Sequence, residues 1–318
     1  MNSIIKRKII LADSIHLKGL DLLKKNKFEV VNATGADIEK LLGIASKYNA
    51  VVLIVRSTRK IDKPLIDRIK KETHLKLICT ASSGYDNIDV EHAIKNGIKV
   101  FNVPKGNFIS AAEHTFALIL SISKNVITAN NDMRKPVFDF TKYNNFELAD
   151  KIIGIVGVGR VGSHVARIAK AFKMKILGCD IDKSLIAKYE WIKFVNLKNI
   201  LLKSDILTIH TPLNETTLNM IGEKELKFMK KESVLINCAR GGIINEASLI
   251  KALKNNQFKY AGLDVFVNEP HFNKEFSSLK NIILTPHLAG KTRESKERMS
   301  VQLAESIINY YNKKSSKR

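Results

Sequence analysis

Three ionisable side chains of different chemistry each stand a few residues after a strand-like run. Arg240 follows VLIN, Glu269 follows AGLDVF, and His287 follows IILTP. A guanidinium can hold a carboxylate bidentately and polarise a carbonyl, and an imidazole can exchange a proton near neutral pH. A carboxylate beside the imidazole orients the ring and stabilises its protonated form. Together the three groups suit hydride transfer at a 2-hydroxy or 2-keto acid, which needs no nucleophile and no metal from the protein.

Each of these residues also has a purely structural interpretation. His287 could be a hydrogen-bonded structural histidine, Glu269 could cap or bridge the chain before Pro270, and Arg240 could be an ion-pair partner. Their shared position favours catalysis, because ligands of α/β proteins bind beyond the carboxyl ends of the strands. The sequence contains no HxxxH or CxxC spacing, so we expect no metal site.

The segment Lys151–Asp180 has the pattern of a dinucleotide-binding unit. An apolar run, IIGIV, leads into the glycine-rich turn GVGRVG, and the residues that follow have the apolar spacing of a helix. A second strand-like run, KILGC, then ends at Asp180. A glycine-rich turn alone is a weak signal, but the complete strand–turn–helix–strand–acid order predicts a nicotinamide-dinucleotide site.

Each residue of this pattern has a mechanical role. Gly157 allows the tight turn, Gly159 lets the backbone approach a pyrophosphate, and Gly162 lets the helix pack closely on the strand. The start of the helix offers free N–H groups to the phosphates. Asp180 can accept hydrogen bonds from ribose hydroxyls and would repel a 2′-phosphate, so the sequence favours NAD over NADP.

The composition is that of a water-soluble globular protein. The chain has 318 residues, of which 45% are hydrophobic and 26% charged, and this length is enough for two domains. No apolar run approaches the roughly 20 residues that span a bilayer, and the first apolar run indicates a strand more than a signal peptide. Scattered cysteines at positions 79, 179 and 238 suggest buried thiols in a reducing cytoplasm.

The net charge of +22 raises the question of a nucleic-acid partner. The lysines are spread over predicted helix faces, and no basic stripe with interleaved aromatic residues occurs; only the tail KKSSKR is a concentrated run. We therefore expect no nucleic-acid function. The charge either keeps the protein soluble or concentrates anionic substrates and cofactor near the site.

Strand-like and helical runs alternate along the chain, which predicts α/β domains with doubly wound parallel sheets. The first domain is expected over residues 1–105 with 293–318, and it lacks a glycine fingerprint, so it is the candidate substrate domain. The second, over residues 106–292, is the candidate NAD domain. One long helix is expected over Ser110–Asp132, with Ser110 as its N-cap, followed by an irregular loop to Asp150. A last helix, Arg293–Asn312, is expected to return to the first domain.

At the candidate catalytic residues the chain resembles the D-isomer-specific 2-hydroxyacid dehydrogenases. The segments GVGRVG, NCARGGIINEASLIKAL, GLDVFVNEP and LTPHLAG look like the signatures of that family and occur in the right order. VRSTRKI, SSGYDNID, GIKVFNVPKGN and AAEHTFALIL extend the likeness over nearly the whole chain. The resemblance implies a flavodoxin-like substrate domain and a Rossmann NAD domain that flank a cleft, and a homodimer formed through the cofactor domain.

The resemblance also implies roles for individual residues. Arg240 would bind the substrate carboxylate, Glu269 would support the histidine, and His287 would be the acid/base. Further NAD contacts would come from Ser83, Arg160, Val161, Asp180, Thr211, Cys238, Ala239, Asp264, His287 and Gly290, and further substrate contacts from Arg56, Ser57 and Gly84.

Within the family, VRSTRKI and GYDNID are most similar to 3-phosphoglycerate dehydrogenases, which favours 3-phosphoglycerate as substrate and a place in serine biosynthesis. That subfamily commonly has an arginine where Thr80 stands, and Arg56, Arg59 or Arg134 would have to replace it. A regulatory C-terminal domain is not expected after the last helix. Two alternatives stay open: a hydroxypyruvate/glyoxylate or D-lactate-type reductase, and an NAD-sensing corepressor that binds partner proteins.

Overall fold

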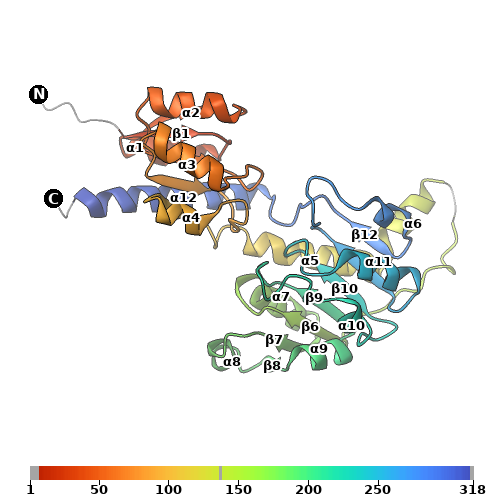
Figure 1. Ribbon diagram of the computed structural model, residues 1–318. Coiled ribbons are helices and arrows are strands. Elements are labelled where there is room, and N and C mark those ends of the chain that lie inside the picture. The colour runs from red at the N-terminus through yellow and green to blue at the C-terminus, as the bar shows by residue number, and fades with distance from the viewer. Residues whose placement is uncertain (1–6, 136–137, 316–318) are drawn as a thin grey trace, which may run out of the picture. The chain divides into compact units, whose positions relative to one another are not determined.

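The computed structural model describes residues 7–135 and 138–315, so the end of the basic tail lies outside the described residues. The chain divides into two compact units, Met1–Asn107 with Thr292–Arg318, and Phe108–Lys291. Each unit holds a parallel sheet with helices packed on it (Figure 1). This confirms the predicted α/β class with two parallel sheets.

The first unit has a sheet in the order β2-β1-β3-β4-β5, which is the flavodoxin-like order. Its strands are β1 (Lys8–Leu11), β2 (Glu29–Asn32), β3 (Val52–Val55), β4 (Leu77–Thr80) and β5 (Lys99–Phe101). Its helices are α1 (Leu17–Lys25), α2 (Ile38–Lys47), α3 (Lys63–Glu72), α4 (Val90–Lys95) and α12 (Arg293–Ser315).

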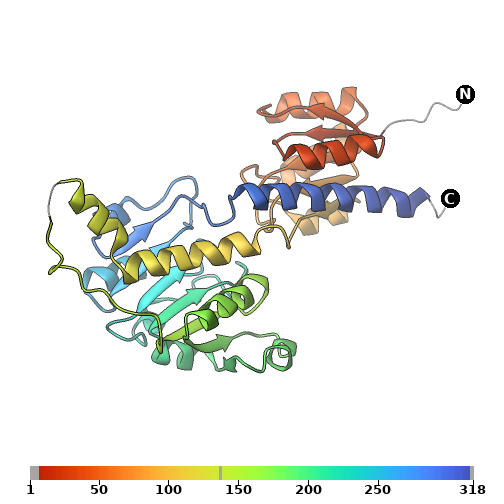
Figure 2. The ribbon, with the colours of Figure 1, turned by 180° about the vertical axis from the view of Figure 1, so that it is seen from behind.

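Helices bury both faces of this sheet, which explains why its central strands are continuously apolar. Strands β3 (VLIV) and β4 (LICT) are buried at every position. Residues of α2, α3 and α4 form the core on one face, and residues of α1 and α12 form the core on the other. Figure 2 shows α12 running alongside α1, although the two helices lie at opposite ends of the chain. Side chains cap the helices locally, as where Asp37 accepts the N–H of Lys40 at the start of α2.

The second unit has a sheet in the order β12-β11-β10-β9-β6-β7-β8. Its strands are β6 (Ile152–Val156), β7 (Lys175–Cys179), β8 (Lys193–Phe194), β9 (Ile206–Ile209), β10 (Val234–Asn237), β11 (Tyr260–Leu263) and β12 (Ile282–Leu284). Its helices are α5 (Phe108–Ser123), α6 (Val126–Met133), α7 (Arg160–Ala171), α8 (Ser184–Lys188), α9 (Leu197–Lys203), α10 (Glu223–Leu226) and α11 (Glu246–Lys254), with a 3₁₀ turn η1 (Lys274–Ser278).

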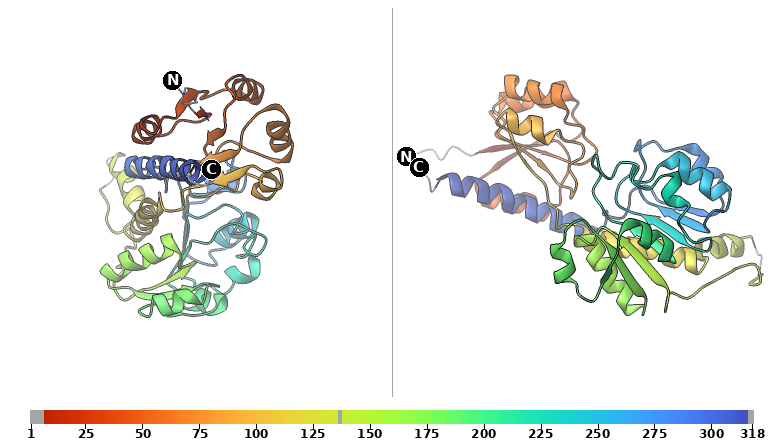
Figure 3. Two further views of the ribbon diagram at one scale, coloured as in Figure 1. Left: turned by 90° about the vertical axis from the view of Figure 1, so that its left-hand side faces the viewer. Right: turned by 60° about the horizontal axis from the view of Figure 1, so that its bottom comes forward.

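Helices α5 and α7 contribute to the core on one face of the second sheet, and α9, α10 and α11 to the core on the other (Figure 3). The strand order reverses at β6, which has β7 on one side and β9 on the other. In open parallel sheets ligands bind beyond the carboxyl ends of the strands at such a switch point. The loops after β6, β7, β9, β10, β11 and β12 are therefore where functional side chains are expected.

Two local predictions are wrong. The helix expected over Ser110–Asp132 is two helices, because Asn125 adopts a left-handed backbone conformation (φ 51°) that ends α5 and begins α6. Ser110 does not cap the helix: it lies inside α5, and its hydroxyl donates to the carbonyl of Ala289. The short strand β8 was not predicted, since two residues carry no periodicity. Across the described part of the chain, no helix has the length and apolarity to cross a bilayer.

Candidate active site

The glycine-rich turn after β6 is shaped by close backbone contacts. Gly157 has a left-handed φ of 89°, and a Cβ there would lie 2.8 Å from the carbonyl of His210. A Cβ on Gly162 would lie 2.0 Å from the carbonyl oxygen of Gly157, so α7 can pack on the turn only with glycine at this position. In contrast, a Cβ on Gly159 would meet no atom within 4 Å. The backbone at Gly159 thus borders open space, as the approach of a pyrophosphate requires.

Asp180 fixes this turn from the end of β7. Its Oδ2 accepts the N–H of Val158 at 2.6 Å, and its Oδ1 accepts the N–H of Asp182 at 3.0 Å. Each carboxylate oxygen has two lone pairs, so one acceptor position on each is left for a hydroxyl. The residue that was predicted to bind the ribose therefore also links the glycine turn to the neighbouring strand.

Thr211, which follows β9, places a hydroxyl group beside the glycine turn. Its hydroxyl is buried and has no hydrogen-bond partner among the described residues. Its backbone N–H lies 2.9 Å from where a Cβ on Gly157 would stand, so the two loops are in contact. A buried hydroxyl without a partner costs roughly 1–3 kcal/mol. A polar ligand group at the turn would satisfy it, and the residues present therefore fit a bound dinucleotide.

The turn that carries Arg240 is built by the residue that ends β10. Asn237 is buried, and its amide donates to the carbonyl of Arg240 at 2.9 Å while its side-chain oxygen accepts the N–H of Ala239 at 3.0 Å. The Arg240 guanidinium itself donates to the carbonyl of Ala239 at 2.6 Å. Asn237 was not predicted as a site residue. The signal was present, since an asparagine directly after a buried apolar strand commonly closes a turn.

Backbone contacts join the Arg240 turn to the loops that carry the other two catalytic candidates. A Cβ on Gly241 would lie 2.0 Å from the carbonyl carbon and oxygen of Phe266, so the two loops touch backbone to backbone. The N–H of Phe266 donates to Oε1 of Glu269 at 3.0 Å. Oε2 of Glu269 in turn bonds Nδ1 of His287 at 2.5 Å. The loops after β10, β11 and β12 thus form one connected structure.

The Glu269–His287 pair is accessible to a ligand. About a third of each side chain is exposed, 33% for Glu269 and 37% for His287. Burial raises the pKa of Glu269, but the hydrogen bonds from His287 and from the N–H of Phe266 outweigh it and hold the pKa below its usual value. Glu269 is therefore ionised at neutral pH. The Nε2 atom of His287 has no partner in the described chain, so it is left for a substrate oxygen.

His287 has a left-handed backbone (φ 52°), which is unusual for a residue other than glycine, and Asp264 holds it there. The N–H of His287 donates to the carbonyl of Asp264 at 2.9 Å. The Asp264 carboxylate accepts the N–H groups of Leu288 at 2.7 Å and Ala289 at 2.8 Å, and the hydroxyl of Thr285 at 2.6 Å. A buried carboxylate thus fixes the backbone on both sides of His287.

Several opposing influences act on the Asp264 carboxyl group. Burial raises its pKa, but the hydrogen bonds from His114, Thr285 and the backbone of Ala289 and Leu288 prevail and lower it. Asp264 was predicted as an NAD contact. In the structure it is buried, and its carboxylate contacts Thr285, Leu288, Ala289 and His114 of the described chain.

Helix α5 contributes two residues that sequence reasoning did not place here. Nε2 of His114 lies 3.1 Å from the hydroxyl of Thr285 and 3.4 Å from Oδ1 of Asp264, and the hydroxyl of Ser110 donates to the carbonyl of Ala289 at 2.6 Å. Ser110 and His114 are four residues apart and so lie on the same helix face. Helix α5 also carries Glu113, Thr115, Ser121 and Ser123, so the spacing of Ser110 and His114 did not mark this contact in the sequence.

The remaining residues predicted in this unit lie at the same sheet edge. Arg160 and Val161 begin α7 directly after the glycine turn, Ala239 precedes Arg240, and Gly290 follows the His287 loop. The Cys238 side chain belongs to the core, and burial together with the nearby Asp264 raises its pKa to about 12. Among the described residues, no group of three or more His, Cys, Asp and Glu side chains is placed to hold a metal ion.

In the first unit, the residues predicted to contact substrate (Arg56, Ser57 and Gly84) or NAD (Ser83) follow adjacent strands. Arg56 and Ser57 come directly after β3, and Ser83 and Gly84 come after β4. Asp13 accepts the N–H of Arg56 at 2.9 Å, and the carbonyls of Ser83 and Gly84 accept hydrogen bonds from Asn102 and Ser82. The two loops are therefore held by side chains of the same unit.

Two of the three arginines that could replace the one absent at position 80, Arg56 and Arg59, lie in the first unit. Arg59 forms an ion pair with Asp13 at 3.6 Å, and both side chains are largely buried. Arg56 instead lines a cavity. Thr80 is fully buried and bonds the hydroxyl of Ser82 at 2.7 Å, so its side chain does not reach that cavity.

Comparison with known proteins adds to this geometry. Residues 116–289 match the model of the D-isomer specific 2-hydroxyacid dehydrogenase NAD binding domain. The chain is 36% identical to the D-3-phosphoglycerate dehydrogenase of Archaeoglobus fulgidus over 95% of its own length and 57% of that protein's. It is 36% identical to the glyoxylate reductase of Pyrococcus furiosus over 95% of its length and 92% of that protein's. Among solved structures, an acyclic imino acid reductase in complex with NADPH and D-Arg is 31% identical, with a TM-score of 0.86 over 96% of this chain and 97% of the other.

The fold and the site therefore define an α/β protein with a nicotinamide-dinucleotide domain. The chain belongs to the D-isomer specific 2-hydroxyacid dehydrogenase family. It spans little more than half the length of the phosphoglycerate dehydrogenases that it matches.

Proposed function

We propose that the protein is an NAD-dependent dehydrogenase that interconverts a D-2-hydroxy acid and its 2-keto acid. The observation that carries this proposal is the Glu269–His287 pair, whose Nδ1–Oε2 distance is 2.5 Å. Its loops are joined to the Arg240 turn through the backbone contact at Gly241. A histidine with one nitrogen held by an ionised carboxylate and the other nitrogen available is the arrangement that acid/base catalysis needs.

Each residue of the site has a separate role in the proposed reaction. The guanidinium of Arg240 binds the substrate carboxylate and polarises the 2-keto group. Nε2 of His287 donates its proton to the keto oxygen during reduction and takes the hydroxyl proton back during oxidation. Glu269 holds the ring and stabilises its positive charge. NAD, when bound, supplies or accepts the hydride.

The cofactor preference rests on Asp180. Its carboxylate is fixed by the N–H of Val158, so it cannot turn away from a ligand without releasing the glycine turn. Ribose hydroxyls would donate to it, whereas a 2′-phosphate would face a negative charge. We therefore assign NAD rather than NADP.

For the substrate, we propose 3-phosphoglycerate and its keto form, 3-phosphohydroxypyruvate. Two points support it: the likeness to proteins named D-3-phosphoglycerate dehydrogenase, and Arg56, which lines a cavity of the first unit. The second candidate is an unphosphorylated acid such as glyoxylate or hydroxypyruvate. It is favoured by Thr80 in place of the subfamily's arginine, and by the Pyrococcus glyoxylate reductase, which the chain matches over almost all of that protein's length.

The test is NADH oxidation with a panel of 2-keto acids, phosphorylated and unphosphorylated, by the wild type, His287→Ala and His74→Ala. His74 is an exposed histidine of the first unit and serves as the matched control. We expect His287→Ala to lower kcat by roughly 10²–10⁴ while NADH affinity changes much less, because proton transfer is the main function that the substitution removes. Normal turnover in His287→Ala would contradict the acid/base role. A wild type that oxidises NADH with none of the acids would contradict the proposed activity, and a preference for unphosphorylated acids would select the second candidate.

A further inference from the structure

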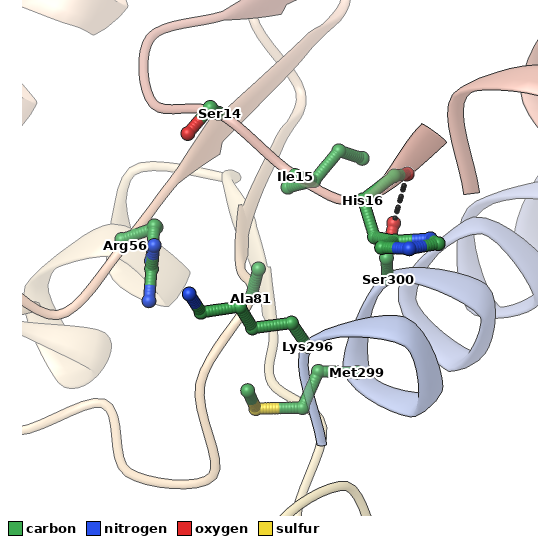
Figure 4. A pocket seen from close by; sticks show the side chains of 8 residues that line it. All are labelled: Ser14, Ile15, His16, Arg56, Ala81, Lys296, Met299 and Ser300. Carbon is green, nitrogen blue, oxygen red and sulfur yellow. Dashed lines mark hydrogen bonds between the residues drawn. The ribbon is translucent and has the colours of Figure 1, made fainter. Parts of the chain in front are cut away.

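A cavity of about 150 Å³ in the first unit has two cationic side chains on its wall. Arg56 enters it from the end of β3, and Lys296 enters it from the first turns of α12 (Figure 4). In the close-up the ammonium of Lys296 extends toward the side on which the Arg56 guanidinium lies. The remainder of the wall includes Ser14 and His16 from the loop before α1.

Within residues 7–135 and 138–315, neither cation has a carboxylate partner within ion-pair distance. The nearby acids are already engaged. Asp13 accepts the backbone N–H of Arg56 and pairs with Arg59, and Glu297, the neighbour of Lys296, pairs with Lys18 at 2.5 Å. The cavity therefore carries two positive charges that its own unit does not neutralise.

Like charges that converge on one cavity repel each other unless water or an anion lies between them. A monoanionic carboxylate needs one guanidinium, and the proposed function already assigns that role to Arg240. A phosphate monoester carries ≈ −1.5 to −2 charge at pH 7 and three acceptor oxygens, which suits a guanidinium and an ammonium together. The serine and histidine on the same wall offer further hydrogen-bonding groups.

We propose that Arg56 and Lys296 bind the phosphate of the substrate, and that Lys296 is the residue that makes this chain select a phosphorylated 2-keto acid. The proposal rests on the proposed dehydrogenase function and names the substrate class of the same reaction. Lys296 was not among the residues predicted from the sequence, because a single lysine in a lysine-rich chain carries no signal until the fold places it beside Arg56.

The first experiment compares kcat/KM for 3-phosphohydroxypyruvate and hydroxypyruvate, with NADH, in the wild type, Lys296→Met, Arg56→Met and Lys24→Met. Lys24, exposed near the end of α1, is the matched control for the loss of one positive charge in the same unit. We expect Lys296→Met to lower the ratio of the two kcat/KM values about tenfold, the usual effect of losing one charge-assisted contact, and Arg56→Met to lower it at least as much. Lys24→Met should leave the ratio within about twofold of the wild type. An unchanged ratio in Lys296→Met, or an equal fall in Lys24→Met, would overturn the proposal.

The second experiment does not depend on turnover, so it separates failure of this proposal from failure of the proposed function. Inorganic phosphate is titrated calorimetrically into the wild type and Lys296→Met, each saturated with NAD so that the glycine turn is occupied. We expect Lys296→Met to bind phosphate at least about fivefold more weakly than the wild type. Equal affinity in the two proteins, or no phosphate binding to the wild type, would overturn the cation pair as an anion site. A wild type that reduces no 2-keto acid yet shows the expected difference would overturn the substrate assignment and keep the anion site.

Discussion

Replacing Asp264 by asparagine tests whether this buried carboxylate fixes the loop that carries His287. The carboxylate accepts the hydroxyl of Thr285 and the N–H of Leu288 at Oδ1 and the N–H of Ala289 at Oδ2, and Nε2 of His114 lies 3.4 Å from Oδ1. Asparagine has the same shape but only one acceptor oxygen, and its NH₂ group must face one of these donors. The less costly orientation sets it against the N–H of Ala289, which then stays buried without a partner.

The magnitude follows from this geometry. Leaving the Ala289 N–H unsatisfied costs roughly 1–3 kcal/mol, and replacing charged by neutral acceptance at the other two bonds weakens each of them. We expect a loss of about 3 kcal/mol in the free energy of unfolding. For a domain of roughly 150–250 residues, each kcal/mol lowers Tm by about 2–4 °C, so the transition of the second unit should fall by about 6–12 °C. Turnover should fall as well, because the left-handed backbone of His287 loses part of its support.

The assay is differential scanning calorimetry at pH 7, with Asp182→Asn as the control. Asp182 makes similar hydrogen bonds, to the N–H and hydroxyl of Ser184, but it is exposed, so we expect a change of at most about 2 °C.

The pKa of Asp264 is lowered by folding. Its contribution is therefore present above the unfolded-state value near 4 and is lost as the pH falls below it. The difference in Tm between wild type and Asp264→Asn should shrink below about pH 4. A decrease of 2 °C or less at pH 7 would refute this reasoning.

Three further outcomes are expected. The wild type should have a kcat/KM with NAD(H) at least about tenfold higher than with NADP(H), and Asp180→Ser should lower this ratio. Equal kcat/KM values with the two cofactors in the wild type would contradict the role of Asp180. Gly241→Ala should lower both the Tm measured by calorimetry and kcat, because its Cβ would lie 2.0 Å from the Phe266 backbone. A Tm and a kcat near the wild-type values would show that the two loops can move apart at little cost. Thr80→Arg should lower Tm without raising the preference for the phosphorylated acid, since position 80 is fully buried; a raised preference would show that this position can reach the anion site.

The α/β class and most of the strands could be predicted from the sequence. Parallel strands buried on both faces are continuously apolar, and the glycine turn follows one of them. Strand β10 was predicted at its observed bounds, Val234–Asn237, and so were β6 and β7. The break between α5 and α6 was not predicted. The left-handed backbone of Asn125 that causes it is only one of several conformations that the local sequence allows.

The candidate site was predictable where a residue type and its place after a strand coincide, as for His287. It was not predictable where the contact joins distant segments. His114 meets Thr285, and Lys296 joins Arg56 at one cavity, only after the chain has folded. Neither histidine nor lysine at those positions departs from an ordinary helix face. Long-range proximity of this kind is a product of the sheet order and cannot be inferred from local spacing.

The backbone contact between Gly241 and Phe266 has a consequence for engineering the specificity of this protein. The loops after β10 and β11 fit each other through main-chain atoms, and the second of them holds Glu269 through the N–H of Phe266. A loop transplanted singly from a relative with another length or turn would lose its fit to its neighbour. Loop exchange should therefore move the segments after β10, β11 and β12 as one block. Redesign by point substitution belongs instead at Lys296, whose side chain no backbone contact depends on.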